Sequence, residues 1–308
     1  MTPAHLPAMV SETLSFLDPQ PGKTILDLTL GSGGHARQML SRGARVIGLD
    51  RDAEALQRAQ EALRGFEDRL TLLHARMSEA AEALSREGIS QIDGALLDAG
   101  ISMDQMLDEG RSFSVHSRSG LDMRMDRSDP EALTAYDVVN RYLEKDLARL
   151  FAVIGKGGEA RRVARRIVEA RGREPIRSTA ALAELIAATV VRERPARAID
   201  AAPFLMAIRI EVNNELGELQ EGIEAAISSL SHTGKLVTLT WNSAEHHVCR
   251  QTLRHLANPC TCPPTLPCAC GKKPVVQLLT RKSLYPAREE VEANAAARSV
   301  RLTAAMKL

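Results

Sequence analysis

Three aspartates follow or end apolar segments close to a glycine-rich turn. Asp27 lies four residues before Gly31, which opens the segment GSGGHA, and Asp50 lies 19 residues after Gly31. Asp98 ends another apolar run, IDGALLD. A glycine turn lets the backbone come close to a ligand, and an acid spaced like Asp50 can accept hydrogen bonds from ribose hydroxyls. The pattern predicts a site for a cofactor that contains adenosine.

Two features of this turn favour S-adenosylmethionine over a dinucleotide. The dinucleotide pattern G-x-G-x-x-G lacks its third glycine, because Ala36 stands there. The carboxylate of Asp27 would repel a pyrophosphate, whereas it suits the cationic amino-acid part of S-adenosylmethionine. The alternative is a glycine turn that serves the fold alone. We interpret the turn and the aspartates together as a site for S-adenosylmethionine.

The elements that must position these residues alternate between strands and helices. Apolar runs bounded by turn residues predict buried parallel strands, and we expect Asp52 to cap the helix that follows it. The expected strands are residues 23–30, 44–50, 70–75 and 91–98, and helices are expected at 33–42 and 53–64. This order predicts an α/β fold with a Rossmann-like parallel sheet and right-handed crossovers. The three aspartates then meet at the carboxyl edge of that sheet.

The middle of the chain departs from this alternation. Residues 100–128 are polar and predict a long loop, and residues 130–201 have apolar residues at helical spacing throughout. We therefore predict a loop and helical insertion domain at 106–205. The cofactor-binding domain is expected at 1–105 and 206–308.

Three further elements are expected after the insertion. A long helix at about 203–230 leads back to the sheet, and GKLVTLTW at 234–241 predicts a strand. A helix and a cysteine-rich loop follow, and PVVQLLTRK at 274–282 predicts the last strand.

Composition bounds the class of protein. The chain is 44% hydrophobic and 26% charged, which excludes a disordered chain. The first residues have neither the apolar core of a signal peptide nor an Arg-rich transit segment, and no apolar run is long enough to span a membrane. We expect a cytoplasmic protein without a membrane partner.

The positive charge is unevenly distributed. Residues 141–200 contain 14 Lys and Arg against 8 Asp and Glu, an excess of +6 in a chain whose net charge is +1. Solvated helix faces are one explanation, and a footprint for nucleic-acid phosphates is the other. Four arginines stand out because they share helix faces at i, i+4 spacing, namely Arg161, Arg162, Arg165 and Arg166.

Four of the five cysteines lie within eleven residues. Cys260, Cys262, Cys268 and Cys270 form the pattern C-x-C-x5-C-x-C. Four thiolates can hold zinc tetrahedrally, although C-x-C is tighter than the usual C-x-x-C. The alternative is a proline- and cysteine-rich loop without a metal. Cys249 is expected to be a small buried hydrophobe.

Several longer segments resemble the MraW-type family of methyltransferases. These enzymes modify the exocyclic N4 of a cytosine in bacterial small-subunit ribosomal RNA. The likeness starts at His5 and Glu12 and covers most of the chain. It is carried by the segments LGSGGHA, GLDRD, IDGALLDAGIS, SFSVHSRSGLDMRMD, ARRVARRIVEARGREPI and AIRIEVNNEL. The resemblance implies a class I methyltransferase sheet with a helical insertion that recognises RNA.

The resemblance also implies which residues bind S-adenosylmethionine. Asp50 would hold the ribose, and Met77 would pack against the adenine, although Met77 in a plain core is the alternative. The implied cofactor contacts are Gly33, Gly34, His35, Asp50, Met77, Asp98 and Gln105. The implied partner is the RNA of the small ribosomal subunit, and a homodimer is left open.

In the implied reaction the nucleophile, the exocyclic N4 of cytosine, is weak and must be activated. The lone pair of cytosine N4 is delocalised, so a group that accepts an N4 hydrogen bond would localise that pair. Asp98 is the first catalytic candidate, together with the backbone of Ile101 and Ser102. Asp122 is the second candidate, with Arg124 from the same loop; a helix cap and a surface ion pair are the alternative roles.

Three segments depart from the family pattern on the substrate side. They are AIDAAP at 198–203, TWNSAEH at 240–246 and IGKG at 154–157. They keep two alternatives open, a methyltransferase for a different RNA or macromolecule and a ribosome-assembly factor that keeps the cofactor pocket without turnover.

Overall fold

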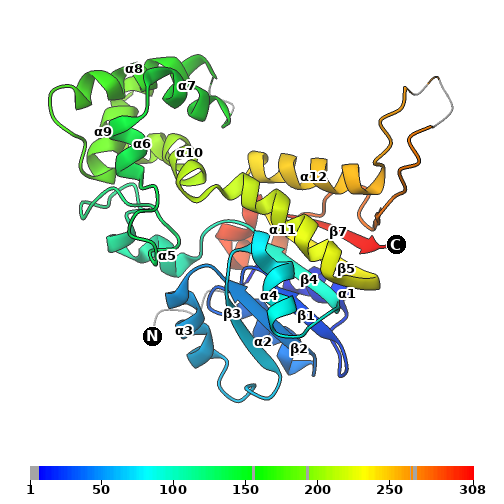
Figure 1. The fold of residues 1–308 in the computed structure, drawn as a ribbon. Helices are drawn as coiled ribbons and strands as arrows, with labels where there is room; N and C mark the ends of the chain where they lie inside the picture. Colours follow the sequence, from blue (N-terminus) through cyan, green and yellow to red (C-terminus); the bar gives the residue numbers. More distant parts are fainter. Residues whose placement is uncertain (1–6, 155–156, 192–193, 264, 266–268) are drawn as a thin grey trace. The chain divides into compact units, whose positions relative to one another are not determined.

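The computed structural model describes residues 7–154, 157–191, 194–263, 265 and 269–308. The chain divides into two compact units (Figure 1). We call the part up to Gly100 together with Leu216–Leu308 the sheet unit, and Ile101–Glu215 the helical unit. His5 and Cys268, which the sequence analysis singled out, lie outside the described residues.

A seven-stranded sheet forms the centre of the sheet unit, in the order β3-β2-β1-β4-β5-β7-β6. The first five strands in the chain run parallel to one another, whereas β7 is antiparallel to both of its neighbours. The strands are β1 (Thr24–Asp27), β2 (Arg45–Asp50), β3 (Leu70–His74), β4 (Ile92–Asp98), β5 (Leu230–Thr240), β6 (Val276–Leu278) and β7 (Arg301–Lys307). The reversal of strand order beside β1 is where open α/β sheets bind ligands.

Helices cover both faces of this sheet (Figure 1). Successive residues of a strand point to opposite faces, and Ile25 and Leu26 of β1 enter two different cores. This double burial explains why the strands are apolar without alternation. The helices are α1 (Val10–Leu17), α2 (Gly34–Ser41), α3 (Ala53–Ala62), α4 (Ala80–Arg86), α11 (Glu215–Ser229), α12 (Ser243–Ala257) and α13 (Arg288–Ala293), with 3-10 turns η1 (Met77–Glu79) and η4 (Ala295–Ser299).

The helical unit has its own hydrophobic core. Phe151 and Phe204 meet edge to face there, with ring centroids 5.2 Å apart. Its helices are α5 (Met103–Leu107), α6 (Ala135–Arg141), α7 (Glu144–Ala152), α8 (Gly157–Arg171), α9 (Thr179–Val190) and α10 (Ala202–Asn213), with 3-10 turns η2 (Glu109–Arg111) and η3 (Ala198–Ala201). Because it has a separate core, this part of the chain is a packed unit and not an extended loop.

The structure confirms the first four strands and the cap at Asp52, whose side chain accepts a hydrogen bond from the backbone N–H of Glu54. The long helix predicted at 203–230 is wrong, because Asn214 adopts a left-handed backbone (φ 49°) and separates α10 from α11. Asparagine tolerates this conformation better than most residues. The long loop predicted at 100–128 also contains α5 and η2.

The prediction of the last strand was also wrong. The segment 274–282 contributes only the edge strand β6, and the last strand is β7. The β6 ladder ends because the N–H groups of Leu279 and Thr280 both donate to the carbonyl oxygen of Ala304. β7 escaped prediction because its small residues give little apolar signal, although it pairs on both sides.

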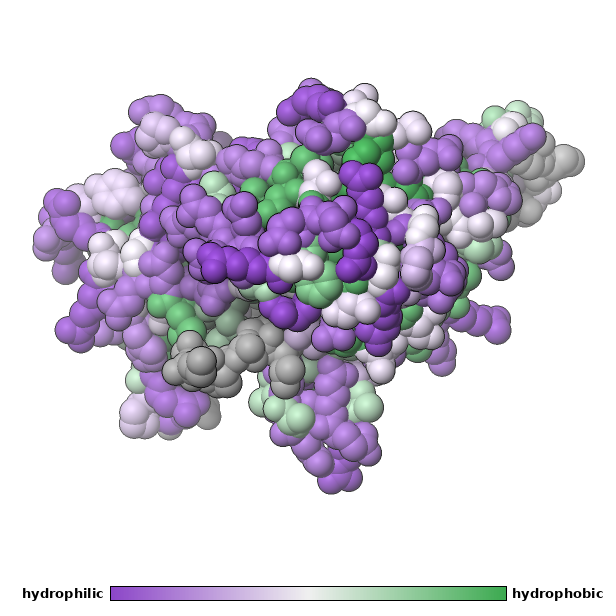
Figure 2. Space-filling view, turned by 90° about the horizontal axis from the view of Figure 1, so that it is seen from below, coloured by the Kyte–Doolittle hydropathy of each residue, from purple (hydrophilic) through white to green (hydrophobic). Residues whose placement is uncertain are grey.

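Hydrophilic side chains cover most of the face shown in Figure 2, with hydrophobic residues showing in areas between them. In the described part of the chain, no helix is both long and apolar enough to cross a membrane.

Candidate functional site

The glycine-rich turn after β1 places its backbone at the beginning of α2. Gly31 and Gly33 have φ angles of 54° and 81°, which favour glycine because it lacks a Cβ. At Gly33 a Cβ would also lie 2.8 Å from Cδ1 of Leu63. The N–H of Gly33 closes the turn by donating to the carbonyl oxygen of Leu30 over 2.8 Å. The backbone conformation therefore favours glycine at both positions, and at Gly33 the contact with Leu63 favours it as well.

Asp50 at the end of β2 is tied to this turn. Its Oδ2 accepts the N–H of Gly31 over 2.8 Å, and its Oδ1 accepts the N–H of Asp52 over 2.9 Å. Burial raises the pKa of Asp50, and these two hydrogen bonds oppose that rise. Each carboxylate oxygen has a second lone pair, so the carboxylate is fixed in place and can still accept from a ligand hydroxyl.

Asp27 ends β1 as a buried carboxyl group with only 2% of its surface exposed. Burial raises its pKa to about 7, although the N–H of Thr29 donates to it over 3.2 Å; the charges of Asp98 and Asp50 raise the pKa further. A carboxyl group kept this far from water gains most from a cationic partner.

Asp98 at the end of β4 is held through both its backbone and its side chain. Its backbone N–H donates to Oγ1 of Thr29 over 2.7 Å, and its Oδ1 accepts from Nε1 of Trp241 over 2.9 Å. Its Oδ2 lies 3.9 Å from Nε2 of His35 on α2. The side chain keeps 24% exposure. The carboxylate is thus oriented by the indole and still partly open.

The pKa of Asp98 is raised to about 7. Burial is the main cause, the Trp241 hydrogen bond lowers the pKa, and the charge of Glu245 raises it. A carboxyl group with a pKa near 7 changes its charge around neutral pH.

Trp241 is the site residue that the sequence analysis missed. It follows β5, and its own N–H donates to Oε2 of the buried Glu245 over 2.8 Å. Asn242 caps α12 in a capping box with Glu245, which fixes the turn that carries the indole. The available signal was that the only tryptophan of the chain directly follows an apolar run. A buried indole usually needs an acceptor, and the sheet edge provides Asp98.

Met77 lies three residues beyond the end of β3, where His74 pairs with Asp50. The side chain is half-buried in one core of the sheet unit. A Cβ on Gly222 of α11 would come within 2.8 Å of Cγ of Met77, so the two surfaces are closely packed. The core contact that we named as the alternative is present, and the adenine contact stays a prediction.

Gln105 lies in the helical unit, on the short helix α5. Its Oε1 accepts the N–H of Ser102 over 3.1 Å in a capping box, and its side chain is buried. Capping explains the residue locally. Its cofactor contact rests on the family resemblance and stays a prediction.

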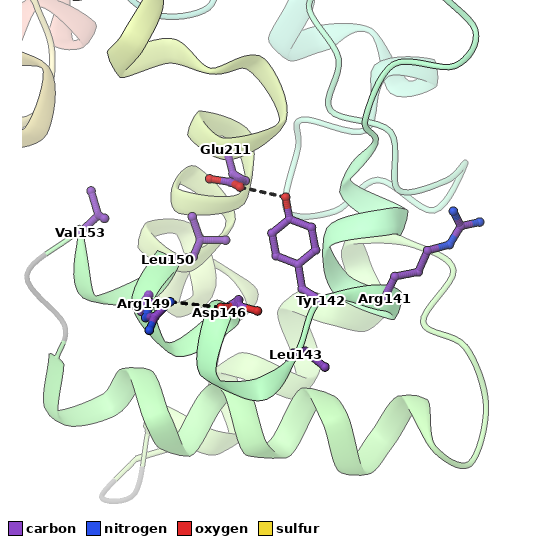
Figure 3. Close-up of a pocket in the computed structure, with 8 residues that line it drawn as sticks. All are labelled: Arg141, Tyr142, Leu143, Asp146, Arg149, Leu150, Val153 and Glu211. Carbon is purple, nitrogen blue, oxygen red and sulfur yellow. Dashed lines mark hydrogen bonds and ion pairs between the residues drawn. The ribbon is translucent and has the colours of Figure 1, made fainter.

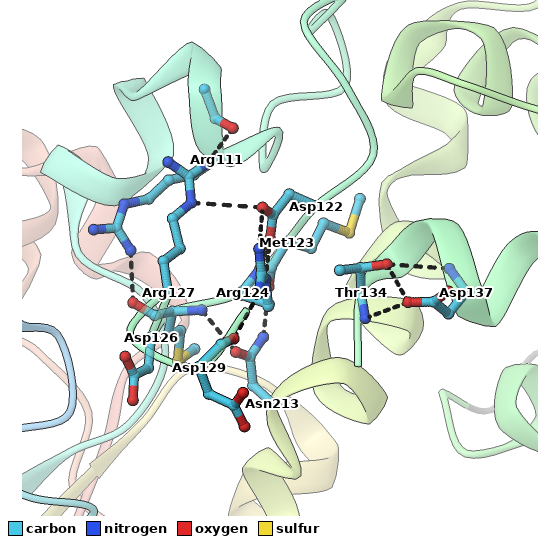
Figure 4. A network of polar contacts seen from close by, with 12 residues as sticks. Arg111, Asp122, Met123, Arg124, Asp126, Arg127, Asp129, Thr134, Asp137 and Asn213 are labelled. Atoms are coloured by element: carbon cyan, nitrogen blue, oxygen red, sulfur yellow. Dashed lines mark hydrogen bonds and ion pairs between the residues drawn. The ribbon is translucent and has the colours of Figure 1, made fainter. Parts of the chain in front are cut away.

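Asp122 also lies in the helical unit, where it forms a paired ion network (Figure 4). Its two oxygens accept from Nε and Nη2 of Arg124 over 2.9 and 3.1 Å, and Nε of Arg127 lies 3.6 Å away. Burial would raise the pKa of Asp122, but the hydrogen bonds and charges of the two arginines lower it. The ion pair that we considered is present, whereas α6 is capped by Thr134 and not by Asp122.

The loop around Asp122 is held from below by Asn213 of α10. The amide of Asn213 accepts the N–H of Met125 over 2.8 Å and donates to the carbonyl oxygen of Met123 over 2.7 Å (Figure 4). Met123 has a left-handed φ of 62°. Because both chemical ends of the amide are used, the loop conformation depends on this one side chain. Within the segment GLDMRMD, the ion pair accounts for Asp122 and Arg124.

Of the four arginines of α8 that were predicted to contact RNA, three are exposed at the surface. Arg161, Arg165 and Arg166 are exposed, whereas Arg162 is half-buried. Glu169 lies 3.8 Å from Nε of Arg165 and 3.5 Å from Nη1 of Arg166. Exposed pairs of this kind are weak, so these arginines can exchange Glu169 for another anion.

A hollow of about 610 Å³ lies in the helical unit between α6, α7 and α10 (Figure 3). The phenol of Tyr142 points across it and donates to Oε1 of Glu211 over 2.8 Å. Arg141 and Arg149 stand on its rim, with side chains 74% and 79% exposed. The hollow therefore combines an aromatic ring with two accessible cations.

The cysteine cluster is separate from the sheet edge. The thiols of Cys260, Cys262 and Cys270 all lie within 4.8 Å of one another. Cys249 is fully buried and its Sγ lies 3.0 Å from Oγ1 of Thr238, as expected for a structural thiol.

The sheet order and the acids and glycines at the ends of β1, β2 and β4 define a class I methyltransferase that uses S-adenosylmethionine. The chain belongs to the MraW methylase family, whose model matches residues 2–308. Both findings confirm the fold class, the cofactor and the family that the sequence predicted.

Curated relatives are similar over nearly the whole chain. A ribosomal RNA small subunit methyltransferase H of Symbiobacterium thermophilum is 41% identical over 99% of this chain and 96% of its own length. The protein of the same name from Carboxydothermus hydrogenoformans is 39% identical over 99% and 98%. Among solved structures, an rRNA methylase from Streptococcus thermophilus aligns over 99% of both chains, but its TM-score of 0.45 at 11% identity is too low to support a conclusion.

Proposed function

We propose that this protein transfers a methyl group from S-adenosylmethionine to the exocyclic N4 of a cytidine in small-subunit ribosomal RNA. Membership of the MraW methylase family and the names of the relatives support the RNA class. The single structural observation that carries the proposal is Asp98, a partly open carboxylate oriented by Trp241 at the cofactor edge of the sheet.

The reaction is an in-line displacement. The N4 lone pair forms the new bond to the methyl carbon while the sulfur–carbon bond of the sulfonium breaks and its electron pair stays on sulfur. One N4 proton is then lost to a base or to water, which leaves S-adenosylhomocysteine and N4-methylcytidine. Holding the two reacting atoms close and aligned supplies much of the acceleration.

In this proposal Asp98 accepts the N4–H of the target base. A carboxylate acceptor draws the lone pair out of the ring and stabilises the charge that develops on nitrogen. The hydrogen bond from Trp241 supports the ionised form of Asp98 and fixes its orientation. A paired base must leave its helix to reach such a group.

The cofactor contacts are proposed from the same edge. Gly33, Gly34 and His35 contact the donor at the turn, Asp50 binds its ribose, and Met77 packs against its adenine. The buried carboxylate of Asp27 favours the positive charge of the donor. Gln105 and Asp122 belong to the helical unit, and their roles toward cofactor and base rest on the resemblance alone.

We propose that the insertion predicted at 106–205 binds the RNA backbone. Its charge excess, the exposed arginines of α8 and the hollow beside Tyr142 support this role. Proteins commonly stack unstacked bases on aromatic rings and bind phosphates with arginines. A cytoplasmic location and a homodimer stay predictions.

The test is transfer of labelled methyl groups to small ribosomal subunits from cells without this gene, followed by mass analysis of digested RNA. We expect N4-methylcytidine, and Asp98→Asn should lower the rate by about 100-fold or more, as loss of a group that stabilises developing charge does. Asp68→Asn is the matched control, because Asp68 is 73% exposed and away from the site. Label in another macromolecule would support a different acceptor, and donor binding without transfer would support an assembly factor.

A further inference from the structure

An arm of the sheet unit joins α12 to β6, and we call residues 258–275 the cysteine arm. Figure 1 shows its two limbs, in orange, leading away from the end of α12. The base of the arm is closed, because the N–H of Val275 donates to the carbonyl oxygen of Leu256 over 2.8 Å. The N–H of Leu308, at the end of β7, donates to the carbonyl oxygen of Val275 over 3.0 Å. These two bonds hold only the base of the arm, so other interactions must stabilise the two limbs.

Hydrophobic burial does not stabilise the limbs. None of the described residues of the cysteine arm is buried, and the first buried residue after it is Val276. A segment without a core is usually held by disulfides, a metal or a partner. The arm therefore differs from the rest of the sheet unit in what can stabilise it.

Three thiols from both limbs converge in the arm. Cys260 and Cys262 lie on the outgoing limb and Cys270 on the returning limb, and their sulfurs are within 4.8 Å of one another. Zinc holds thiolates at about 2.3 Å in a tetrahedron, which places the sulfurs about 3.8 Å apart. The cluster is close to that spacing before any metal is added.

A second observation supports a thiolate site. The backbone N–H of Ala269 lies 3.4 Å from Sγ of Cys262 and donates to it. A hydrogen bond from an amide to sulfur favours the charged thiolate, which is the form that binds a metal. The donor comes from the returning limb, so the same contact also aligns the two limbs.

We propose that Cys260, Cys262 and Cys270 bind a zinc ion as thiolates and clip the two limbs of the cysteine arm together. The ion takes a fourth ligand from outside these three residues. Its role is structural, because the three thiols join the outgoing and the returning limb of the arm. It is distinct from the methyl-transfer site and does not depend on the proposed function.

The test uses the full-length protein, stripped of metal with a chelator under reducing conditions and titrated with Zn²⁺ or Co²⁺. We expect one equivalent to bind tightly, with the charge-transfer absorption of cobalt–thiolate bonds. The triple variant Cys260→Ser/Cys262→Ser/Cys270→Ser should lose this band. Cys249→Ala is the matched control, since it removes a buried thiol outside the cluster.

Limited proteolysis gives an independent readout of the clip. Removal of the metal should speed cleavage within the cysteine arm roughly tenfold or more without changing the affinity for S-adenosylmethionine. The proposal is overturned if the folded, reduced protein binds no metal tightly, or if the triple variant binds as much metal as the wild type. A disulfide among these cysteines in protein purified under reducing conditions would overturn it as well.

Discussion

Replacing Trp241 with Phe tests how the site sets the charge of Asp98. Phenylalanine keeps an aromatic ring after β5 and removes only the indole N–H, which donates to Oδ1 of Asp98 over 2.9 Å. That hydrogen bond lowers a pKa that burial has raised to about 7. We therefore expect Trp241→Phe to raise the pKa of Asp98 further.

The size of the effect follows from the strength of the bond. A hydrogen bond to a charged group contributes about 1.5–3 kcal/mol, and one pKa unit corresponds to about 1.4 kcal/mol. Because the side chain of Asp98 keeps 24% exposure, we take the lower end of that range, about one unit. Near neutral pH the ionised fraction of Asp98 then falls from about one half to about one tenth. The rate of methyl transfer should fall about fivefold.

The assay is the pH dependence of single-turnover methyl transfer. In Trp241→Phe the acid limb of the profile should move to higher pH by about one unit, and the rate should recover on the alkaline side. A packing defect would lower the rate at every pH, so recovery separates the two causes. In the Asp98→Asn background the same Trp241→Phe change should have little further effect, because no carboxylate remains to titrate.

Two results would refute this reasoning. One is a profile of Trp241→Phe that superimposes on the wild type. The other is a loss that persists unchanged at alkaline pH and in the Asp98→Asn background, because the indole would then act only through packing.

Three further predictions follow from the geometry. Asp27→Asn should raise the free energy of unfolding above neutral pH by up to about 4 kcal/mol. The reason is that the pKa of Asp27 is about 7 in the folded state and 3.8 in the unfolded state, so the wild type loses stability as pH rises through that interval. Urea unfolding that shows the same difference between the two proteins at pH 5 and pH 8 would contradict this prediction. Gly33→Ala should weaken binding of S-adenosylmethionine in calorimetry, whereas Gly65→Ala, with a φ of 94° and no atom within 4 Å, should cost stability alone; equal affinities in the two variants would argue against the turn. Arg161→Gln/Arg165→Gln should reduce the salt slope of RNA binding by about 1–2, and an unchanged slope would remove α8 from the RNA surface.

The sheet edge could be predicted because its residues carry strong local signals. Burial on both faces makes β1, β2 and β4 continuously apolar, so Asp27, Asp50 and Asp98 stand out where those strands end. The glycine turn is equally local, since its φ angles follow from neighbouring backbone atoms. Parallel pairing then brings the three acids together without further information.

The partner of Asp98 could not be predicted in this way. Trp241 is 143 residues away in the sequence, and only the pairing of β4 with β5 brings the two together. The place of β7 between β5 and β6 is likewise a matter of long-range pairing, and residues such as Ala304 and Ala305 carry almost no periodic signal. Contacts of this kind depend on topology and not on local propensity.

The helical unit shows a third limit, because polar residues with catalytic character can be structural. The segment GLDMRMD has the acids and arginines of a site, but Asp122 pairs with Arg124, and Asn213 binds the backbone of Met123 and Met125. The ionised state of Asp122 is stabilised by two guanidinium groups, which makes it a weak proton acceptor. The spacing of residues in the sequence cannot distinguish a carboxylate that forms an ion pair from one that can bind a ligand.

The contrast between Asp122 and Asp98 therefore bears on which acid acts on the substrate. Arg124 and Arg127 already stabilise the ionised form of Asp122, so a bound donor or base would add little stabilisation. Asp27 and Asp98 lie at the sheet edge with pKa values near 7, so a nearby positive charge would stabilise their ionised forms. The sulfonium donor brings that charge. A nearby positive charge favours the ionised form of both acids, and the ionised form of Asp98 is the one that can accept the N4 proton.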